Sequence, residues 1–259
     1  MSNITSHIEN VAISDLVNAY GTPLYVYSKN NIENAFKRYK EAFGDKQHLI
    51  CYAVKANSNL SVIALLAKLG AGLDIVSRGE LLRVLKAGGE AKKVIVSGVG
   101  KSRDRLRFAL DTGIHCFNVE SEAELYMLNE EAEKLGKIAP ISFRVNPDVD
   151  AKTHPYISTG LRENKFGIPY DEAVRIYKAA HELKHVEIKG IDCHIGSQLT
   201  ELSPYCDAVD RMLTLIDELS ANGIQLSHFD MGGGVGIDYQ GESLIDLQEL
   251  VDMVYEKLG

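Results

Sequence analysis

The chain has 259 residues, of which 45% are hydrophobic and 25% are charged, as is usual for a soluble globular protein with one large core. Its formal net charge of -8 at pH 7, without any basic run, argues against nucleic-acid binding and favours small molecules or a second copy of the chain as partners. No apolar stretch reaches the roughly 20 residues of a membrane span, residues 1–5 do not resemble a signal peptide, and the four cysteines form no CxxC pair, so we expect a cytoplasmic protein.

The N-terminal segment carries little periodicity before a turn at residues 21–23. After this turn the apolar residues 24–27 predict a short strand. Ser28 or Asn30 can then cap a helix that runs to Phe43.

From residue 49 onward, short apolar runs alternate with helical stretches at a spacing of about 20 to 25 residues. The predicted strands are 49–54, 72–76, 94–97, 115–119, 139–146, 187–194 and 225–231. The predicted helices are 59–69, 78–88, 102–112, 121–135, 170–180, 205–222 and 243–258. Several of these helices end at a glycine that suits a C-cap, namely Gly70, Gly88, Gly113, Gly136 and Gly223. This alternation predicts an α/β fold with a parallel sheet covered by helices.

Seven such βα units are visible, whereas a closed (β/α)8 barrel of the TIM type needs eight. An open barrel would leave a row of backbone groups unpaired at its edge. Either residues 24–27 supply the eighth strand, or the sequence is part of a longer protein. We favour the second interpretation.

The first strand of the repeat delivers Lys55 to a polar turn at its carboxyl end. Lysine is rarely buried, but at the mouth of a barrel it can lose its proton and trap an aldehyde cofactor such as pyridoxal phosphate. A lone lysine at a strand end is more often a plain surface residue. The interpretation of Lys55 therefore depends on what the later strands carry.

Two charged residues interrupt later apolar strands. Asp74 lies in the second strand, where its carboxylate could pair with Lys55 or could simply order nearby loops. Arg144 lies in the fifth strand, where it could hold a phenolate or carboxylate or brace the barrel through a buried ion pair.

The sixth strand ends at His194, which is followed by Gly196 and Ser197 in a loop whose N–H groups could bind an anion. A single histidine on an apolar strand is as often a core residue with satisfied hydrogen bonds. A metal site built from Cys193, His194 and Cys206 lacks any recognisable ligand spacing.

The seventh strand leads into the glycines Gly232, Gly233, Gly234 and Gly236. Glycines after a late barrel strand allow the backbone to approach a phosphate closely, although glycines also serve plain turns. With Lys55 and the histidine at the same end of one barrel, the combination predicts a site for a phosphorylated aldehyde.

Three segments resemble the cofactor motifs of the fold-type III pyridoxal-phosphate enzymes, the alanine-racemase-like barrels: residues 52–57, 193–198 and 232–237. A longer stretch, residues 144–160 continuing at 164–168, is similar to the diaminopimelate decarboxylases. The resemblance covers essentially the whole chain from about residue 17. The first motif is shared with ornithine and arginine decarboxylases, whereas the longer stretch is far more specific.

The resemblance implies pyridoxal 5'-phosphate as cofactor and Lys55 and His194 as catalytic residues. Lys55 would hold the cofactor and transfer a proton, His194 would stack on its ring, and Ser197 would bind its phosphate. The implied cofactor-binding residues are Lys55, Asp74, Arg144, His194, Ser197, Gly232, Gly233, Gly234 and Gly236. The implied reaction converts meso-2,6-diaminopimelate to L-lysine and carbon dioxide, the last step of lysine biosynthesis, with the pyridine ring as electron sink.

Parts of the family pattern are not found in these 259 residues. Members carry a Glu-Pro-Gly-Arg segment after the eighth strand and a C-terminal β domain with substrate-binding residues and a Cys-Glu pair that reaches the partner subunit. We therefore expect an N-terminal, inactive portion of a longer homodimeric enzyme. Residues 1–24 would pack with the β domain, and residues 25–259 would form the incomplete barrel.

Three alternatives stay open. A single-domain barrel that carries pyridoxal phosphate without a robust reaction would have about this length. A racemase should show a different sequence at the sixth strand. A decarboxylase acting on ornithine or carboxynorspermidine would share the cofactor motifs.

Overall fold

The computed structural model describes residues 6–150, 165–239 and 244–259. The chain divides into two compact units, Met1–Gln47 and His48–Gly259. This boundary lies further along the chain than the one predicted between residues 24 and 25. The predicted packing of residues 1–24 on a further domain stays a prediction.

The first unit consists of a small hairpin and two helices: β1 (His7–Ile8), β2 (Val11–Ala12), α1 (Ile13–Tyr20) and α2 (Lys29–Phe43). Of the two candidate caps for α2, the structure selects Ser28, whose hydroxyl oxygen accepts a hydrogen bond from the Asn31 N–H at 3.1 Å. The Glu9 carboxylate accepts hydrogen bonds from the Ser28 hydroxyl at 2.7 Å and from the Asn30 N–H at 2.8 Å. The Ser28 hydroxyl and the N–H groups of Asn30 and Asn31 in the first turn of α2 therefore all have hydrogen-bond partners.

The prediction of a strand at residues 24–27 is wrong. The segment is irregular, belongs to neither sheet of the described residues, and leaves Tyr25 88% exposed. Apolar composition alone does not make a strand when no neighbouring strand pairs with its backbone. These residues therefore do not supply an eighth barrel strand.

The second unit contains the predicted parallel sheet. Its seven strands are β3 (Cys51–Ala53), β4 (Gly72–Ile75), β5 (Val94–Val96), β6 (Cys116–Val119), β7 (Ala139–Asn146), β9 (Val186–Asp192) and β10 (His228–Asp230). They follow the order β10-β9-β7-β6-β5-β4-β3, every neighbouring pair is parallel, and the short β8 (Ile168–Pro169) pairs with the end of β7. Within the part of the chain that the structure describes, no pairing joins β3 to β10. The sheet is a curled, incomplete barrel, as predicted.

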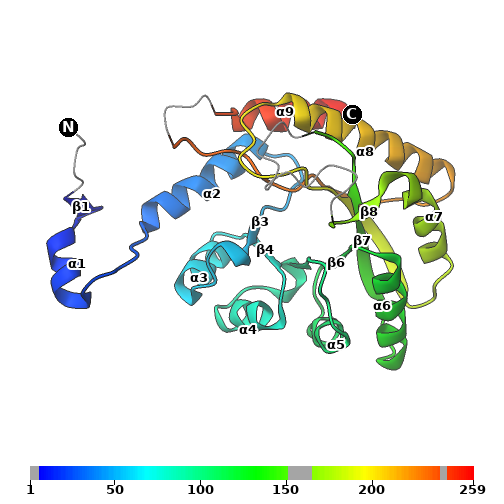
Figure 1. The fold of residues 1–259 in the computed structure, drawn as a ribbon, viewed down its shortest axis with the longest axis horizontal. Coiled ribbons are helices and arrows are strands. Elements are labelled where there is room, and N and C mark those ends of the chain that lie inside the picture. Colours follow the sequence, from blue (N-terminus) through cyan, green and yellow to red (C-terminus); the bar gives the residue numbers. More distant parts are fainter. Residues whose placement is uncertain (1–5, 151–164, 240–243) are drawn as a thin grey trace. The chain divides into compact units, whose positions relative to one another are not determined.

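Helices follow the strands as expected: α3 (Leu60–Lys68), α4 (Arg78–Lys86), α5 (Arg103–Thr112), α6 (Glu122–Lys134), α7 (Tyr170–His181), α8 (Ser203–Ala221) and α9 (Leu247–Leu258). One-turn 3-10 helices occur at Val54–Ala56 and Ala91–Lys93. In Figure 1, α3 to α6 succeed one another along the outside of the strands, and α8 lies beside α9. The five predicted glycine stops all have positive φ, for example 73° at Gly113, which confirms their role in ending helices.

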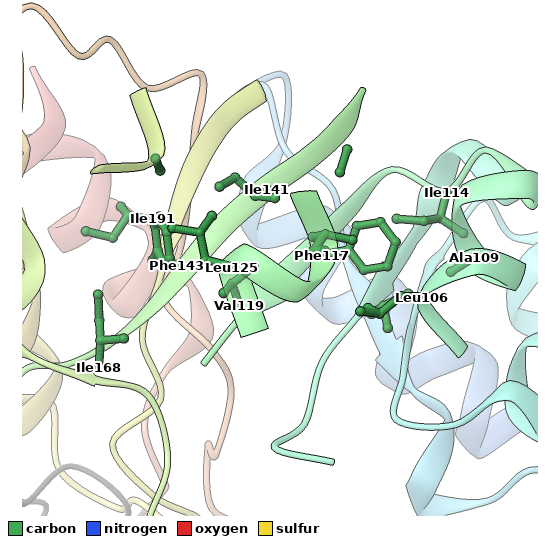
Figure 2. Close-up of a cluster of buried hydrophobic side chains, with 14 of the residues drawn as sticks. Leu106, Ala109, Ile114, Phe117, Val119, Leu125, Ile141, Phe143, Ile168 and Ile191 are labelled. Carbon is green, nitrogen blue, oxygen red and sulfur yellow. The ribbon is translucent and has the colours of Figure 1, made fainter. Parts of the chain in front are cut away.

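The core lies between the outer face of the sheet and the helices. Figure 2 shows Phe117, Phe143 and Ile191 of the strands packed beside Leu106 and Leu125 of α5 and α6. All five side chains are fully buried. Burying each such side chain stabilises the fold by roughly 1.5 to 3 kcal/mol, so strand-to-helix packing holds the strand ends in place.

His228, at the start of β10, is a histidine from which we expect the stability of this unit to depend on pH. Its ring centroid lies 5.8 Å from that of His115. Burial, together with the positive charges of His115 and Lys189, lowers the pKa of His228 to about 4. Below pH 6.5 the unfolded chain binds a proton here that the folded chain accepts only near pH 4, so this contribution to stability is lost as the pH falls through that window.

Replacing His228 with phenylalanine keeps a planar ring and removes this titration. When the pH falls from 7 to 4, the parent should lose about 1 to 2 kcal/mol more of its free energy of unfolding than His228→Phe does. Urea unfolding of both proteins at the two pH values measures this loss. A difference between the proteins that stays constant with pH would contradict this assignment.

No described helix is long and apolar enough to cross a membrane. Of the four cysteines, Cys116 and Cys193 are buried and Cys51 and Cys206 are half-buried, and all four are free thiols. Two of them thus serve as small core residues, as expected.

Candidate functional site

Lys55 lies in the one-turn helix that directly follows β3, and its side chain is exposed at the carboxyl end of the sheet. The Tyr52 hydroxyl donates a hydrogen bond to the Asn57 carbonyl at 3.1 Å and closes the turn around the lysine. The Asn59 side chain then accepts from the Ser61 N–H at 2.8 Å and caps α3. The turn is therefore fixed on both sides of Lys55.

Asp74 of β4, the predicted partner of this lysine, is paired in register with Ala53, two residues before Lys55. Burial raises the pKa of Asp74 to about 6, against the opposing effects of a hydrogen bond from Ser97 and the positive charge of Lys55. Its Oδ1 atom is buried and has no hydrogen-bond partner among the described residues. A buried acceptor of this kind can take up a hydrogen bond from a ligand or from the lysine.

His194 follows β9 and carries no charge at neutral pH. Burial, then the positive charges of Arg144 and Lys55, lower the pKa of His194 to about 4. The Gly233 N–H lies 3.4 Å from Nδ1 of the ring, which places the imidazole proton on Nε2. A neutral, fixed imidazole is suited to lie flat against an aromatic ring.

Arg144 of β7 serves as a brace, one of the two roles considered for it. Its guanidinium lies 3.6 Å from the Glu120 carboxylate and 4.7 Å from the centroid of the Phe166 ring. The other Glu120 oxygen accepts a hydrogen bond from the Gly167 N–H at 3.2 Å. Arg144 and Glu120 thereby hold the chain at residues 166–167 against the end of β7. Residues 151–164 of the family-specific stretch lie outside the described residues.

Sequence reasoning missed two further carboxylates at this edge, Asp192 of β9 and Asp230 of β10. The two residues are paired in register, and Asp192 is also paired with Arg144. Burial raises the pKa of both carboxyls, and the neighbouring Asp230 raises that of Asp192 further. The signal that could have found them is the one that identified Asp74, an aspartate inside an apolar strand.

The glycine loop after β10 packs against the loop after β9, and this packing explains most of its glycines. A Cβ atom at Gly232 would lie 2.6 Å from the Cys193 carbonyl oxygen, and one at Gly234 would overlap the Gly196 carbonyl oxygen. At Gly236 the Leu199 carbonyl oxygen would be 3.0 Å away. These three glycines allow one loop to approach another rather than only a phosphate.

Gly233 differs from its neighbours. A Cβ atom there would have no described atom within 4 Å, and its φ is not in the left-handed region. Ser197, the other predicted phosphate ligand, is exposed in the adjoining loop. Gly233 and Ser197 therefore face accessible space where an anion could bind.

The predicted site residues thus fall into one neighbourhood at the carboxyl edge of the sheet. The neutral imidazole, the unsatisfied Asp74 oxygen, the exposed amine and the open position at Gly233 fit an aromatic aldehyde that bears a phosphate. Among the described residues no cluster of histidine, cysteine and carboxylate side chains is arranged to hold a metal ion.

Comparison with known proteins agrees with this chemistry. Residues 29–259 match the family described as pyridoxal-dependent decarboxylase, pyridoxal binding domain. The diaminopimelate decarboxylase of Vibrio cholerae serotype O1 is 59% identical over 234 residues, which cover 90% of this chain and 56% of that protein. That of Neisseria meningitidis serogroup B is 54% identical over 256 residues, or 99% of this chain and 62% of the relative.

The fold has counterparts among solved structures. Diaminopimelate decarboxylase from Helicobacter pylori complexed with L-lysine matches with a TM-score of 0.92 and 45% identity, over 95% of this chain and 62% of that one. The chain therefore spans less than two thirds of the length of these relatives, between 56% and 62%. The predicted cofactor and barrel class are confirmed at the level of the family.

Proposed function

The chain belongs to the pyridoxal-dependent decarboxylases, and on that premise we propose that the whole protein converts meso-2,6-diaminopimelate to L-lysine and carbon dioxide. This would be the last step of lysine biosynthesis. The relatives that support this substrate are diaminopimelate decarboxylases with 54% and 59% identity to the chain.

Each predicted residue receives a role in this proposal. The amine of Lys55 holds the cofactor and afterwards moves a proton, while the neutral His194 ring orients the pyridine. Ser197 and the N–H groups of the glycine loop bind the phosphate. Asp74 and Arg144 supply a carboxyl group and a positive charge at the same edge. When bound, pyridoxal phosphate supplies an electron sink for the negative charge that remains when carbon dioxide leaves.

One observation carries the proposal. Lys55, Asp74, Arg144 and His194 come from the ends of two pairs of neighbouring strands: Ala53 is paired with Asp74, and Arg144 is paired with Asp192, two residues before His194. The positive charge of Lys55 lowers the pKa of both Asp74 and His194, which agrees with this placement. The four residues therefore lie at the carboxyl edge of the sheet, which is where the active sites of parallel barrels form.

A substrate comparison tests the proposal. The purified whole protein, supplied with pyridoxal phosphate, should release carbon dioxide and lysine from meso-diaminopimelate with a kcat/KM about 100-fold or more above that for L-ornithine. A preference for ornithine would contradict the substrate assignment. Cofactor binding without turnover of any amino acid would favour the carrier alternative.

We propose that residues 1–259 alone bind the cofactor without decarboxylating diaminopimelate. The support is the unclosed order of described strands and the lack of the Glu-Pro-Gly-Arg segment. Normal activity from a 259-residue polypeptide would contradict this.

We also propose that the whole protein is a cytoplasmic homodimer. Four free thiols suit a reducing compartment, and in the enzymes that the chain resembles a partner subunit completes the active site. Light scattering of the whole protein should give twice the mass of one chain.

A further inference from the structure

Two loops run side by side at the carboxyl edge, residues 193–199 after β9 and residues 231–237 after β10. The Leu199 N–H donates to the Gly234 carbonyl at 2.8 Å, and the Gly236 N–H donates to the Leu199 carbonyl at 2.8 Å. Leu199 is thereby paired with Val235 as in a parallel sheet. The sheet thus continues, by one pair, beyond the ends of its two last strands.

The Gln198 side chain extends this pairing. Its amide nitrogen donates to the Ile237 carbonyl at 2.6 Å, and its amide oxygen accepts from the Ile237 N–H at 3.1 Å. One side-chain amide therefore satisfies both polar groups of one backbone residue. Gln198 does this from a left-handed backbone conformation, with φ of 57°, which is unfavourable for a residue other than glycine.

The other end of the glycine loop is held at Gly233. Its N–H lies 3.4 Å from Nδ1 of His194, and its carbonyl accepts a hydrogen bond from the Tyr205 hydroxyl of α8 at 3.0 Å. Between Gly233 and Ile237 the loop is therefore attached at both ends. The hydrogen bonds of Gln198 hold Ile237, at one end of this loop, to the residue that directly follows Ser197.

We infer that Gln198 is a positioning residue that fixes the two halves of the phosphate site relative to each other. One half is Ser197, its neighbour in sequence, and the other is the glycine loop, which Gln198 holds at Ile237. This inference rests on the proposed function, because it takes the space beside Ser197 and Gly233 as the phosphate site. Gln198 acts through the loops and is not itself assigned a contact with the cofactor.

Removing the Gln198 amide should affect binding of the phosphate group and not binding of the rest of the cofactor. Without the Gln198 amide, the glycine loop loses two hydrogen bonds to its neighbour, so its N–H groups are less well placed for an anion. Lys55 follows a different strand, β3, and His194 meets the glycine loop at Gly233, which the Tyr205 hydroxyl also holds, rather than at Ile237. Binding of pyridoxal phosphate should therefore weaken, whereas binding of pyridoxal, which lacks the phosphate, should not.

The test uses two variants in the whole protein, Gln198→Glu and Gln198→Ala. The first keeps the shape and removes the donor, and the second removes both hydrogen bonds without adding a charge. Gln225→Glu is the matched control, since Gln225 lies between α8 and β10, at the amino end of that strand, and its amide donates a hydrogen bond at 2.9 Å to the Ser220 hydroxyl. Pyridoxal phosphate and pyridoxal are each titrated into every protein, and binding is followed by absorbance at about 420 nm. Circular dichroism verifies that each variant is folded.

We expect the dissociation constant for pyridoxal phosphate to rise about tenfold in both Gln198 variants and that for pyridoxal to stay within about twofold of the parent value. Affinities equal to the parent's, or equal losses for both ligands, would overturn the inference while leaving the proposed function intact. If Gln198→Glu does not fold, Gln198→Ala decides alone. A parent that binds no pyridoxal phosphate at all would refute the proposed function, and the inference with it.

Discussion

Replacing Lys55 with methionine should reduce decarboxylation by the whole protein by about a thousandfold or more. Methionine keeps the length of the side chain but has no amine to react with the cofactor aldehyde. Because Lys55 is exposed, the variant should fold and unfold like the parent. Steady-state assays with meso-diaminopimelate and thermal unfolding measure the two quantities.

Lys101 provides the contrast for this variant. It is a buried lysine, and its ammonium donates to the Gly98 and Asn118 carbonyls at 2.8 Å and 2.6 Å and lies 2.7 Å from the Glu124 carboxylate. Its role is structural, so Lys101→Met should lower stability by about 3 kcal/mol or more. An inactive but stable Lys101 variant beside an active Lys55 variant would reverse the assignment of the two lysines.

Adding one methyl group at Gly234 should destabilise the protein by about 3 to 5 kcal/mol. The Cβ atom would overlap the Gly196 carbonyl oxygen, and the φ of 94° is strained for alanine. The loop is held at this position, because the Leu199 N–H donates to the Gly234 carbonyl and the Gly236 N–H donates to the Leu199 carbonyl. Urea unfolding of Gly234→Ala against the parent measures the loss.

Two other glycines separate loop packing from phosphate binding. Gly100→Ala is the matched control, because a Cβ there meets no described atom within 4 Å and φ is not left-handed, so stability should change by no more than about 0.5 kcal/mol. Gly233→Ala should be as stable as the parent yet bind pyridoxal phosphate about tenfold more weakly or worse. Equal stability of Gly234→Ala and Gly100→Ala would contradict the packing described for the loop.

Strands and helices of the second unit were predictable because each strand must be covered on its outer face, which gives a long, regular alternation of apolar runs. The strand at 24–27 failed because the same apolar composition occurs where no neighbour pairs with the backbone. Strand formation depends on a partner, and the local sequence does not contain that information.

For the candidate site, the positions of Lys55 and His194 at the carboxyl edge of the sheet were predictable because each is a polar residue at the end of an apolar strand. Asp192 and Asp230, which are paired in register on β9 and β10, carried the same signal and were overlooked. The role of each glycine could not be predicted from the sequence. A glycine that makes room for a phosphate and a glycine that makes room for a neighbouring loop are the same residue in the sequence. The two roles are distinguished by the residues that the glycines face in the adjoining loop, Cys193 and Gly196.

The active-site assignment depends most directly on which amine binds the cofactor. The purified protein is incubated with pyridoxal phosphate, reduced with borohydride and digested, and the modified peptide is located by mass. We predict a single pyridoxyl group on Lys55, in stoichiometric amount, and none on the Lys55→Met variant. Modification of another lysine at comparable yield, or equal labelling of the variant, would contradict the assignment of this edge of the sheet as the active site.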